Sequence, residues 1–307
     1  MTGWPSVCVI VPTRDRPAQV REAVGSVRRQ DYPGPLSLIV VDDHAELDPE
    51  LASLRADQSR PVRVLANART PGLAGARNTG ILAADSDLVA FCDDDDRWLP
   101  GKLRAQAGAL AARPGAEFAS CSIIVRYESS RIPRLAGRDE VTYADLLRSR
   151  MVMVHSSTYL AWRQALLGGI GLVDETIPGS QSEDWDLALR AARRRPIVHL
   201  DRPLVEVRWG AGSRYAREWE TKAQGLLWML GRHRDIAADR AGAARVYAQL
   251  AFARACQGRR AEALRWAGRS LRSDPRERRV PVALAVVAGV TSGDRVLRAL
   301  HARGHGI

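Results

Sequence analysis

The sequence predicts an α/β fold in which a mainly parallel sheet is flanked by helices and is followed by an α-helical C-terminal region. Apolar, strand-like runs alternate with helical patterns through the first half of the chain, which is typical of stacked βαβ units. Acidic residues directly follow two of these runs, and an Ala- and Arg-rich helical pattern begins near residue 241. We therefore expect a sheet-forming domain over 1–215 and a helical extension over 216–307.

The individual elements follow from hydrophobic periodicity and from proline positions. The expected strands are Val7–Val11, Leu36–Val41, Val62–Leu65, Leu88–Cys92, Ala116–Val125 and Leu204–Arg208. The expected helices are Ala18–Gln30, Glu50–Ala56, Gly75–Ala84, Lys102–Ala112 and Asp184–Arg193. Residues 127–181 carry weak strand and helix signals and several glycines, and they are interpreted as an insertion that faces a second substrate.

Composition indicates an ordinary globular protein, with 46% hydrophobic and 26% charged residues over 307 positions. No apolar run reaches the roughly 18 residues that a membrane-spanning helix needs, and the longest, Val280–Val290, is expected to be a buried helix. A strand-like run begins almost at the N-terminus, so a cytoplasmic location is expected. The four cysteines are far apart in sequence and are expected to be buried free thiols: Cys8, Cys92, Cys121 and Cys256.

The net charge of +11 is concentrated in the tail, where residues 241–307 hold 13 arginines, no lysine and four acidic residues. Compositional bias is one explanation. A second explanation is an anionic membrane surface, which would place the protein at the inner face of the membrane, and a third is an acidic partner. Nucleic acid is excluded as the expected partner, because only Tyr247, Phe252 and Trp266 offer aromatic platforms in this region.

The tail also contains a pattern that resembles one tetratricopeptide unit, a helix pair with small residues at the crossing and a proline at the exit. The pattern consists of Tyr247, Leu250, Ala253, Gly258, Ala263, Leu264, Ala267, Leu271, Asp274 and Pro275. Because one such unit is not stable alone, we expect it to pack on the sheet-forming domain and to take no part in chemistry. A peptide-binding module is the alternative.

Two acidic clusters follow predicted strands, Asp42–Asp43 and Asp93–Asp96. Ligands of open parallel α/β sheets bind outside the carboxyl ends of the strands, so these clusters are placed where a ligand site is expected. Divalent cations such as Mg²⁺ prefer oxygen ligands and often take only one or two protein carboxylates. Solvated turns are the alternative interpretation of both clusters.

A set of motifs, in this order and spacing, resembles the family 2 glycosyltransferases of GT-A fold over about residues 5–210. The motifs are Val9-Ile-Val-Pro-Thr13, Val40-Val-Asp-Asp43, Gly75-Ala-Arg-Asn78, Phe91-Cys-Asp-Asp-Asp-Asp-Arg-Trp-Leu-Pro100 and Ser182-Glu-Asp-Trp-Asp-Leu187. The resemblance implies an inverting enzyme that transfers a sugar from a nucleotide diphosphate donor to an acceptor hydroxyl.

The resemblance also implies roles for individual residues at the donor site. The residues expected to bind the donor nucleotide are Pro12, Thr13, Arg14, Asp43, Arg77, Asn78, Asp93 and Asp94. Asp95 is expected to be the main ligand of Mn²⁺ or Mg²⁺, with Asp93 assisting. Such a cation stabilises the charge that develops on a leaving diphosphate.

In the acidic motif, the resemblance implies that Asp184 is the catalytic base, with Glu183 as its neighbour, and that Trp185 forms an apolar wall for the acceptor. The alternative is that the two acids only begin a helix, where they oppose the helix dipole and where Ser182 is the cap.

One departure from the family pattern concerns a histidine that relatives often place soon after the last strand. Here Arg208 and Ser213 occupy this region and are the candidates for diphosphate contact. His155 and His199 are also available, although a lone histidine is more often structural.

Two rival functions stay open at this point. A nucleotidyltransferase usually begins with a Gly-rich phosphate loop, whereas Pro12-Thr-Arg-Asp15 follows the first strand here. A non-catalytic interaction protein with a vestigial donor site is the other rival. Dinucleotide binding is excluded because no Gly-x-Gly-x-x-Gly follows the first strand.

The sequence does not specify the donor sugar, the nucleobase or the oligomeric state. It also does not specify the acceptor, which is a polysaccharide, a lipid-linked intermediate or a small natural product.

Overall fold

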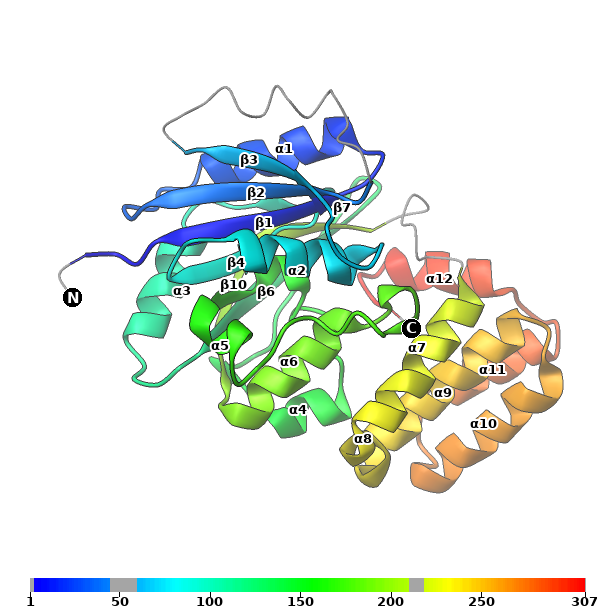
Figure 1. The fold of residues 1–307 in the computed structure, drawn as a ribbon. Helices are drawn as coiled ribbons and strands as arrows, with labels where there is room; N and C mark the ends of the chain where they lie inside the picture. The colour runs from blue at the N-terminus through cyan, green and yellow to red at the C-terminus, as the bar shows by residue number, and fades with distance from the viewer. Residues whose placement is uncertain (1–2, 45–59, 210–217, 307) are drawn as a thin grey trace.

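The computed structural model describes residues 3–44, 60–209 and 218–306. One central sheet forms the N-terminal part, helices flank it, and the C-terminal helices lie together at one side of it (Figure 1). The predicted α/β fold with a helical extension is therefore confirmed. The expected helix Glu50–Ala56, the domain boundary at 215 and Ser213 lie outside the described residues.

The sheet is mixed, and its main path runs β3-β2-β1-β4-β9-β6-β10-β5. Its strands are β1 Val7–Thr13, β2 Leu36–Asp42, β3 Val62–Ala66, β4 Leu88–Phe91, β5 Arg97–Trp98, β6 Phe118–Tyr127, β7 Ser130–Arg134, β8 Glu140–Val141, β9 Leu160–Trp162 and β10 Ile197–Trp209. Pairing is parallel from β3 to β4 and between β6 and β10, and antiparallel elsewhere. The acidic ends of β2 and β4 consequently lie at the same edge of the sheet.

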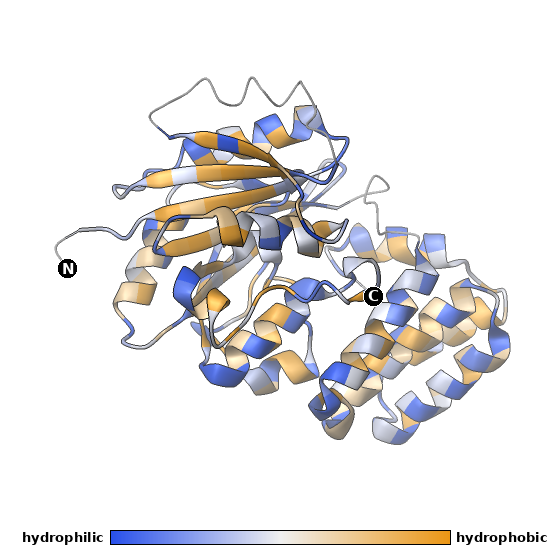
Figure 2. Ribbon diagram, in the orientation of Figure 1, coloured by the Kyte–Doolittle hydropathy of each residue, from blue (hydrophilic) through white to orange (hydrophobic). Residues whose placement is uncertain are grey.

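Strands β1, β2 and β4 are buried on both faces, which explains why they appear in sequence as continuous apolar runs. All seven residues of β1 are buried, and Figure 2 shows the neighbouring strands as mainly hydrophobic. The flanking helices are α1 Pro17–Arg28, α2 Leu73–Ala83, α3 Lys102–Ala111, α4 Tyr143–Arg148, α5 Arg163–Leu167 and α6 Glu183–Arg194.

Helix α2 packs very closely on β1. A Cβ atom at Gly80 would lie 2.5 Å from Ile10 Cγ2, and one at Gly75 would lie 1.9 Å from the Thr70 carbonyl oxygen. Gly80 is therefore required for the close approach of the helix to β1, and Gly75 for the close approach of the preceding segment to the helix. This approach places Arg77, which lies between them in sequence, directly under the strand ends.

The segment 127–181 was expected to be an insertion, and it instead contributes a central strand. β9 lies between β4 and β6 and pairs antiparallel with both. Two short 3₁₀ helices, Ser156–Thr158 and Pro178–Ser180, border the cleft described below. The strand was missed because three residues are too few to show a period.

The extension consists of α7 Trp219–Arg232, α8 Arg234–Ala238, α9 Arg240–Cys256, α10 Arg260–Ser273, α11 Arg279–Val287 and α12 Gly293–His301. Val246, Leu250 and Ala253 of α9 belong to the same hydrophobic core as the sheet. The opposite side of α9 packs on α10 and α11. The expectation that the helix pair packs on the sheet-forming domain is confirmed.

Two smaller expectations about burial are corrected. The run Val280–Val290 is not a buried helix: α11 ends at Val287, and Val290 is 77% exposed. Cys256 is half-buried, while Cys8, Cys92 and Cys121 are buried free thiols as expected. Within the described residues, none of the helices combines the length and apolar character needed to span a bilayer.

Candidate active site

A cleft of about 810 Å³ lies where β1, β2 and β4 end, beside the first turn of α6. Several parts of the chain line it, including residues 70–76, 150–156 and 207–209. The strand ends contribute Pro12, Thr13, Arg14, Asp43 and Asp93–Asp96, the segment before and into α6 contributes residues 175–184, and the C-terminal region contributes Glu218, Lys222 and His301. The acidic motifs that the sequence singled out thus meet around one cavity.

Asp43, at the end of β2, is held in a fixed orientation. Its Oδ1 accepts hydrogen bonds from Asn67 Nδ2 and from the Gly72 amide, both over 2.8 Å, and Arg14 Nη1 lies 3.3 Å from Oδ2. Thr13 Oγ1 donates to Asp94 Oδ2 over 2.8 Å. The predicted nucleotide contacts at β1 and β2 therefore line the cleft and are preorganised.

The loop after β4 concentrates negative charge. Burial and the neighbouring charges of Asp94 and Asp93 raise the pKa of Asp95 to about 6. Arg16, which the sequence analysis missed, offsets part of this charge, because its Nη1 donates to Asp94 over 3.0 Å and to Asp95 over 3.1 Å. Excess negative charge that Arg16 and, at Asp93, Arg77 only partly neutralise is suited to a bound cation.

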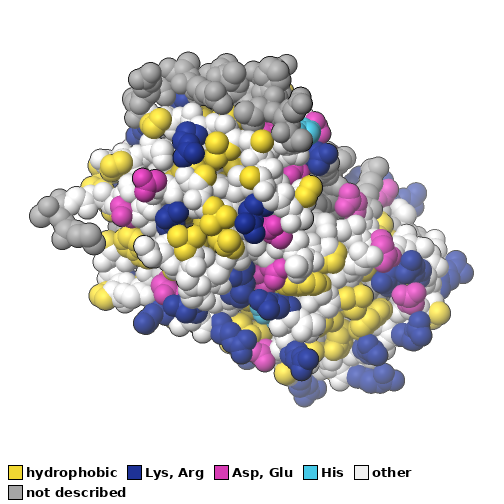
Figure 3. All heavy atoms as spheres, in the orientation of Figure 1, with side chains coloured by type: hydrophobic (Ala, Val, Ile, Leu, Met, Phe, Trp, Pro, Cys, Tyr) yellow, Lys and Arg dark blue, Asp and Glu magenta, His cyan; other side chains and the backbone are white. Residues whose placement is uncertain are grey.

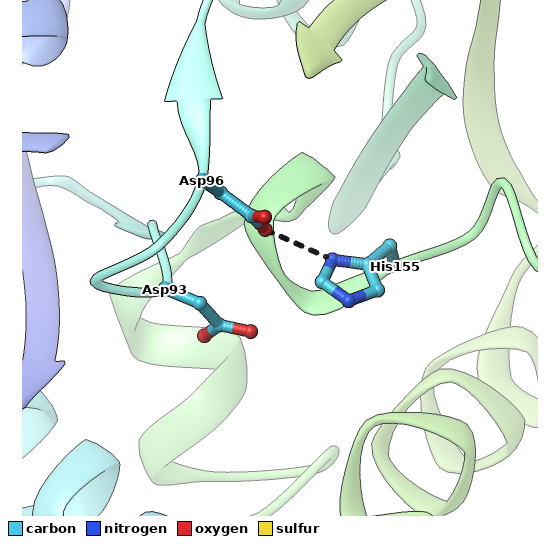
Figure 4. Close-up of side chains that lie close together, drawn as sticks. All are labelled: Asp93, Asp96 and His155. Carbon is cyan, nitrogen blue, oxygen red and sulfur yellow. Dashed lines mark ion pairs between the residues drawn. The ribbon is translucent and has the colours of Figure 1, made fainter. Parts of the chain in front are cut away.

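Asp93, Asp96 and His155 form a compact group at the base of this loop (Figure 4). One ligand atom from each residue lies within 4.8 Å of the others, and His155 Nδ1 is 3.6 Å from Asp96 Oδ2. Two carboxylate oxygens and an imidazole nitrogen suit a transition-metal cation such as Mn²⁺. His155 was ranked as structural because its sequence neighbours gave no sign of this proximity.

Asp96 is the most deeply placed of the four acids. It is 1% exposed, it accepts a hydrogen bond from Ser157 Oγ over 2.6 Å, and the Arg208 amide donates to its other oxygen over 3.2 Å. Both carboxylate oxygens therefore have protein partners. The position of Arg208 also shows that it approaches this loop through its backbone.

His199 has a structural environment. Its two ring nitrogens lie 2.8 Å from Ser120 Oγ and 3.1 Å from Ser122 Oγ, and burial lowers its pKa to about 4. It does not line the cleft. The interpretation of this histidine as structural agrees with its surroundings.

Arg77 and Asn78 were expected to line the donor pocket, and the structure places both beneath it. Arg77 is 2% exposed; its Nη2 donates to Asp93 over 2.7 Å and its Nη1 donates to Glu183. Asn78 exchanges hydrogen bonds with the backbone of Val173 and donates to Glu175. These residues hold the lining carboxylates in place and do not form the lining themselves.

Glu183 and Asp184 begin α6 and both line the cleft. Arg150 Nη2 contacts both oxygens of Asp184, at 2.8 and 2.9 Å. Burial is the largest influence on the pKa of Asp184 and acts to raise it, but Arg150, His155 and Arg77 together outweigh burial and lower the pKa below its usual value. Burial, aided by the Asp184 charge and opposed by Arg77, raises the pKa of Glu183 to about 7.

Two predictions for this helix are corrected. Ser182 makes no side-chain cap and has φ of 74°. Trp185 is 2% exposed, its indole nitrogen donates to the Leu146 carbonyl over 3.0 Å, and it does not line the cleft. Because successive helical residues differ by about 100° around the axis, Trp185 faces the core when Asp184 faces the cleft.

The extension, which was expected to pack on the sheet-forming domain, also reaches the cleft. Lys222 of α7 and His301 of α12 line the cavity. The His301 ring lies 5.2 Å from Trp209 and 5.7 Å from Tyr127, measured between ring centroids. These contacts join residues that lie more than 70 positions apart in the sequence, and they hold this side of the site in place.

Comparison with solved structures shows the GT-A type of fold that the sequence predicted. The chain is similar to S. aureus TarS 1–349 in complex with UDP-GlcNAc, with a TM-score of 0.61 and 16% identity over 98% of this chain and 92% of that one. It is also similar to the mannosyltransferase PcManGT of Pyrobaculum calidifontis in complex with GDP-Man and Mn²⁺. That match has a TM-score of 0.59 and 18% identity, and it covers 98% of this chain and 85% of that one.

Sequence relatives include the Escherichia coli UDP-Glc:alpha-D-GlcNAc-diphosphoundecaprenol beta-1,3-glucosyltransferase WfgD, 27% identical over 47% of this chain and 55% of the relative. A Campylobacter jejuni GalNAc(5)-diNAcBac-PP-undecaprenol beta-1,3-glucosyltransferase is 35% identical over 32% of each chain. The match thus spans about half the length of the first relative and a third of the second. The sequence profile described as glycosyl transferase family 2 matches residues 8–164, and the chain belongs to this family.

Proposed function

We propose that the protein is an inverting glycosyltransferase that moves a sugar from a nucleotide diphosphate donor to an acceptor hydroxyl. The observation that carries this proposal is the meeting of three acidic groups at one cleft. Asp43 comes from the end of β2, Asp93–Asp96 from the loop after β4, and Glu183 and Asp184 from the start of α6. Asp43 and Asp184, which line the cleft, are held in fixed orientations by hydrogen bonds, and this supports a working site over a vestigial one.

The donor nucleoside is proposed to bind where β1 and β2 end. Asp43 there keeps an oriented carboxylate toward the cleft, and Pro12 offers an apolar surface beside it. Thr13 and Arg14 complete this side. The similar solved structures that hold UDP-GlcNAc and GDP-Man support a nucleotide diphosphate sugar as donor.

A divalent cation, Mn²⁺ or Mg²⁺, is proposed to be held by Asp93 and Asp95, with His155 beside Asp93 as a third ligand. Asp95 lines the cleft with 25% of its side chain exposed. The Asp96 side chain is only 1% exposed, against 19% for Asp93, and Asp96 is assigned the role of shaping the loop. When bound, the cation would neutralise charge on the leaving diphosphate.

Asp184 is proposed to take the proton of the acceptor hydroxyl as this oxygen attacks the anomeric carbon. The bond to the nucleotide diphosphate breaks in the same displacement, so the anomeric configuration inverts. A single displacement needs one base, and Glu183 is engaged with Arg77. Asp184 faces the cleft, and the contact that holds it, Arg150, comes from a side chain that is 42% exposed.

The extension is proposed to contact an anionic membrane surface. Its exposed arginines include Arg265, Arg269, Arg272, Arg276 and Arg298, and Figure 3 shows Lys and Arg side chains along the outer edge of these helices. Each basic residue near such a surface contributes about 1 kcal/mol. Co-sedimentation with phosphatidylglycerol vesicles should occur and should weaken in high salt. Equal recovery with neutral phosphatidylcholine vesicles would contradict the contact.

A thermal-shift panel of nucleotide diphosphates, each with and without Mn²⁺ or Mg²⁺, tests the donor assignment. Binding to the native state raises the melting temperature. We expect one nucleobase to give the largest shift, and this shift to require the cation. A panel in which no nucleotide diphosphate changes the melting temperature would contradict the proposal.

A further inference from the structure

Among the described residues, three basic side chains outside the predicted donor contacts line the part of the cleft that is nearest to the C-terminal helices, where Glu218 also lies. They are Arg150, which follows α4, Lys222 of α7 and His301 of α12. We call these three residues the basic wall. We propose that the basic wall binds a phosphate or diphosphate group carried by the acceptor. This inference rests on the proposed glycosyl transfer and assigns the chemical class of the acceptor.

The members of the basic wall are close enough to affect one another's ionisation. Burial, and then the charge of Arg150, lower the pKa of Lys222 to about 8, while Cys256 and Glu218 act in the opposite direction. Burial, and then the charge of Lys222, lower the pKa of His301. Lys222 therefore has Arg150 and His301 as its neighbours in space. A polyanion placed along the three side chains would relieve their mutual repulsion.

Aromatic rings hold the wall in place. Lys222 Nζ lies 4.7 Å from the centroid of the Trp219 ring, and His301 packs against Trp209 and Tyr127. The Arg150 side chain is 42% exposed and presents a planar guanidinium, which suits two phosphate oxygens at once. The arginine offers two parallel N–H donors and the lysine a compact positive charge, and both are held in place before a ligand binds. Such a set binds a phosphate ester better than a neutral sugar.

The position of Arg150 indicates which of the two substrates, donor or acceptor, carries the anion that the basic wall binds. Its guanidinium contacts Asp184, the proposed base, over 2.8 and 2.9 Å. The base must face the acceptor hydroxyl, whereas the donor diphosphate belongs with the cation at Asp93 and Asp95. An anion bound by Arg150 is therefore part of the acceptor. Two of the relatives are named for acceptors on diphosphoundecaprenol or PP-undecaprenol.

The shared arginine gives acceptor binding a chemical consequence. A phosphate on the basic wall competes with Asp184 for the guanidinium of Arg150. When this contact weakens, burial, which is the largest influence on Asp184, raises the pKa of its carboxylate. Asp184 is then a stronger base with an acceptor bound than with water alone in the cleft, which favours transfer to the acceptor over the slower hydrolysis.

The test uses calorimetry on the full chain saturated with UDP and Mn²⁺, so that the donor side is filled. The probes are a short alkyl α-N-acetylglucosaminyl diphosphate, the matched alkyl glycoside without the diphosphate, and inorganic phosphate. The variant is Lys222→Met, and the matched control is Arg232→Met, which removes an exposed charge from the same helix. Lys222→Arg restores the charge and shows that a loss is not caused by misfolding.

We expect the wild type to bind the diphosphate probe at least about tenfold more tightly than the matched glycoside, as charge-assisted hydrogen bonds predict. Lys222→Met should lose about tenfold in affinity for this probe, and Arg232→Met and Lys222→Arg less than about threefold. Affinity for UDP, titrated separately, should stay within about twofold in all variants.

Three results would overturn the inference. The first is an unchanged affinity of Lys222→Met for the diphosphate probe. The second is an equal loss of affinity for UDP in this variant, which would assign the basic wall to the donor. The third is inorganic phosphate that binds as tightly as the probe. The probe is also titrated without UDP. A wild type that binds the probe but no nucleotide would contradict the donor assignment and leave the basic wall supported.

Discussion

Arg77 donates a hydrogen bond to Asp93 over 2.7 Å, and its other terminal nitrogen donates to Glu183. One fully buried guanidinium thus joins the loop after β4 to the first turn of α6. Burial acts against its charge, but Asp93 and Glu183 outweigh burial and raise the pKa of Arg77. The two acidic motifs are consequently fixed relative to each other before any ligand binds.

Arg77→Met should destabilise the fold strongly, because it leaves two buried carboxylates without their cation. Removing one partner of a buried pair costs about 3–5 kcal/mol. Urea unfolding followed by tryptophan fluorescence measures the change. Arg113→Met is the matched control, since its partner Asp139 is 81% exposed and surface pairs contribute about 1 kcal/mol or less. Equal stability of the two variants would contradict the structural role of Arg77.

Two variants in the loop after β4 distinguish the acids that bind the cation from those that do not. Asp95→Asn should weaken Mn²⁺ binding in the presence of UDP by at least about tenfold, since even outer-shell changes cost that much. Asp96→Asn should affect Mn²⁺ less, because the Asp96 side chain is 1% exposed whereas that of Asp95 is 25% exposed. Electron paramagnetic resonance of free Mn²⁺ measures both. Loss of binding in Asp96→Asn alone would show that Asp96 and His155 hold the cation.

Glu175 gives a prediction for the pH dependence of stability. Burial acts to raise its pKa, but hydrogen bonds from Asn78, Arg69 and Thr70 outweigh burial and lower it from 4.5 to about 2. Its folded pKa lies below its unfolded pKa, so its stabilisation is complete above about pH 5 and is lost as the pH falls toward 2. Glu175→Gln should lower the melting temperature at pH 7 by about 2–4 °C.

The difference in melting temperature between Glu175→Gln and the wild type should shrink as the pH is lowered from 5 to 3. Glu22→Gln, at an exposed position on α1, is the control and should follow the wild type at every pH. A difference that stays constant between pH 7 and pH 3 would show that hydrogen bonding of the ionised carboxylate is not the cause.

Most of the sheet and half of the site were predictable from sequence for the same reason. A strand such as Val7–Val11 is apolar because both its faces are buried, and a polar residue directly after such a strand must lie at the sheet edge. Asp43 and Asp93–Asp96 were placed correctly by this rule alone. Strand β9 was missed because its position depends on pairing with two distant strands.

The side of a helix that faces the ligand was not predictable in the same way. Motif spacing placed Arg77, Asn78 and Trp185 near the site, but only the packing of α2 and α6 decides which residue faces the cleft and which faces the core. Arg150, Lys222 and His301 come from three segments with no shared motif. Their meeting depends on how the extension docks, which no local pattern encodes.

The anomeric configuration of the released sugar tests the central claim most directly, and water can serve as the acceptor. A single displacement from an α-linked donor such as UDP-GlcNAc gives the β sugar first. Asp184→Asn removes the base while it keeps the size of the side chain, so it should bind UDP normally and lower this hydrolysis by about 10²-fold or more. Glu183→Gln should lower it less.

Proton NMR of the anomeric signal, recorded in the first minutes after the enzyme is mixed with the donor identified by thermal shift, distinguishes the two outcomes before mutarotation mixes the anomers. We predict that the β anomer appears first with the wild type and that its signal nearly disappears with Asp184→Asn. An α anomer that appears first, or wild-type hydrolysis by Asp184→Asn, would contradict a single displacement assisted by Asp184.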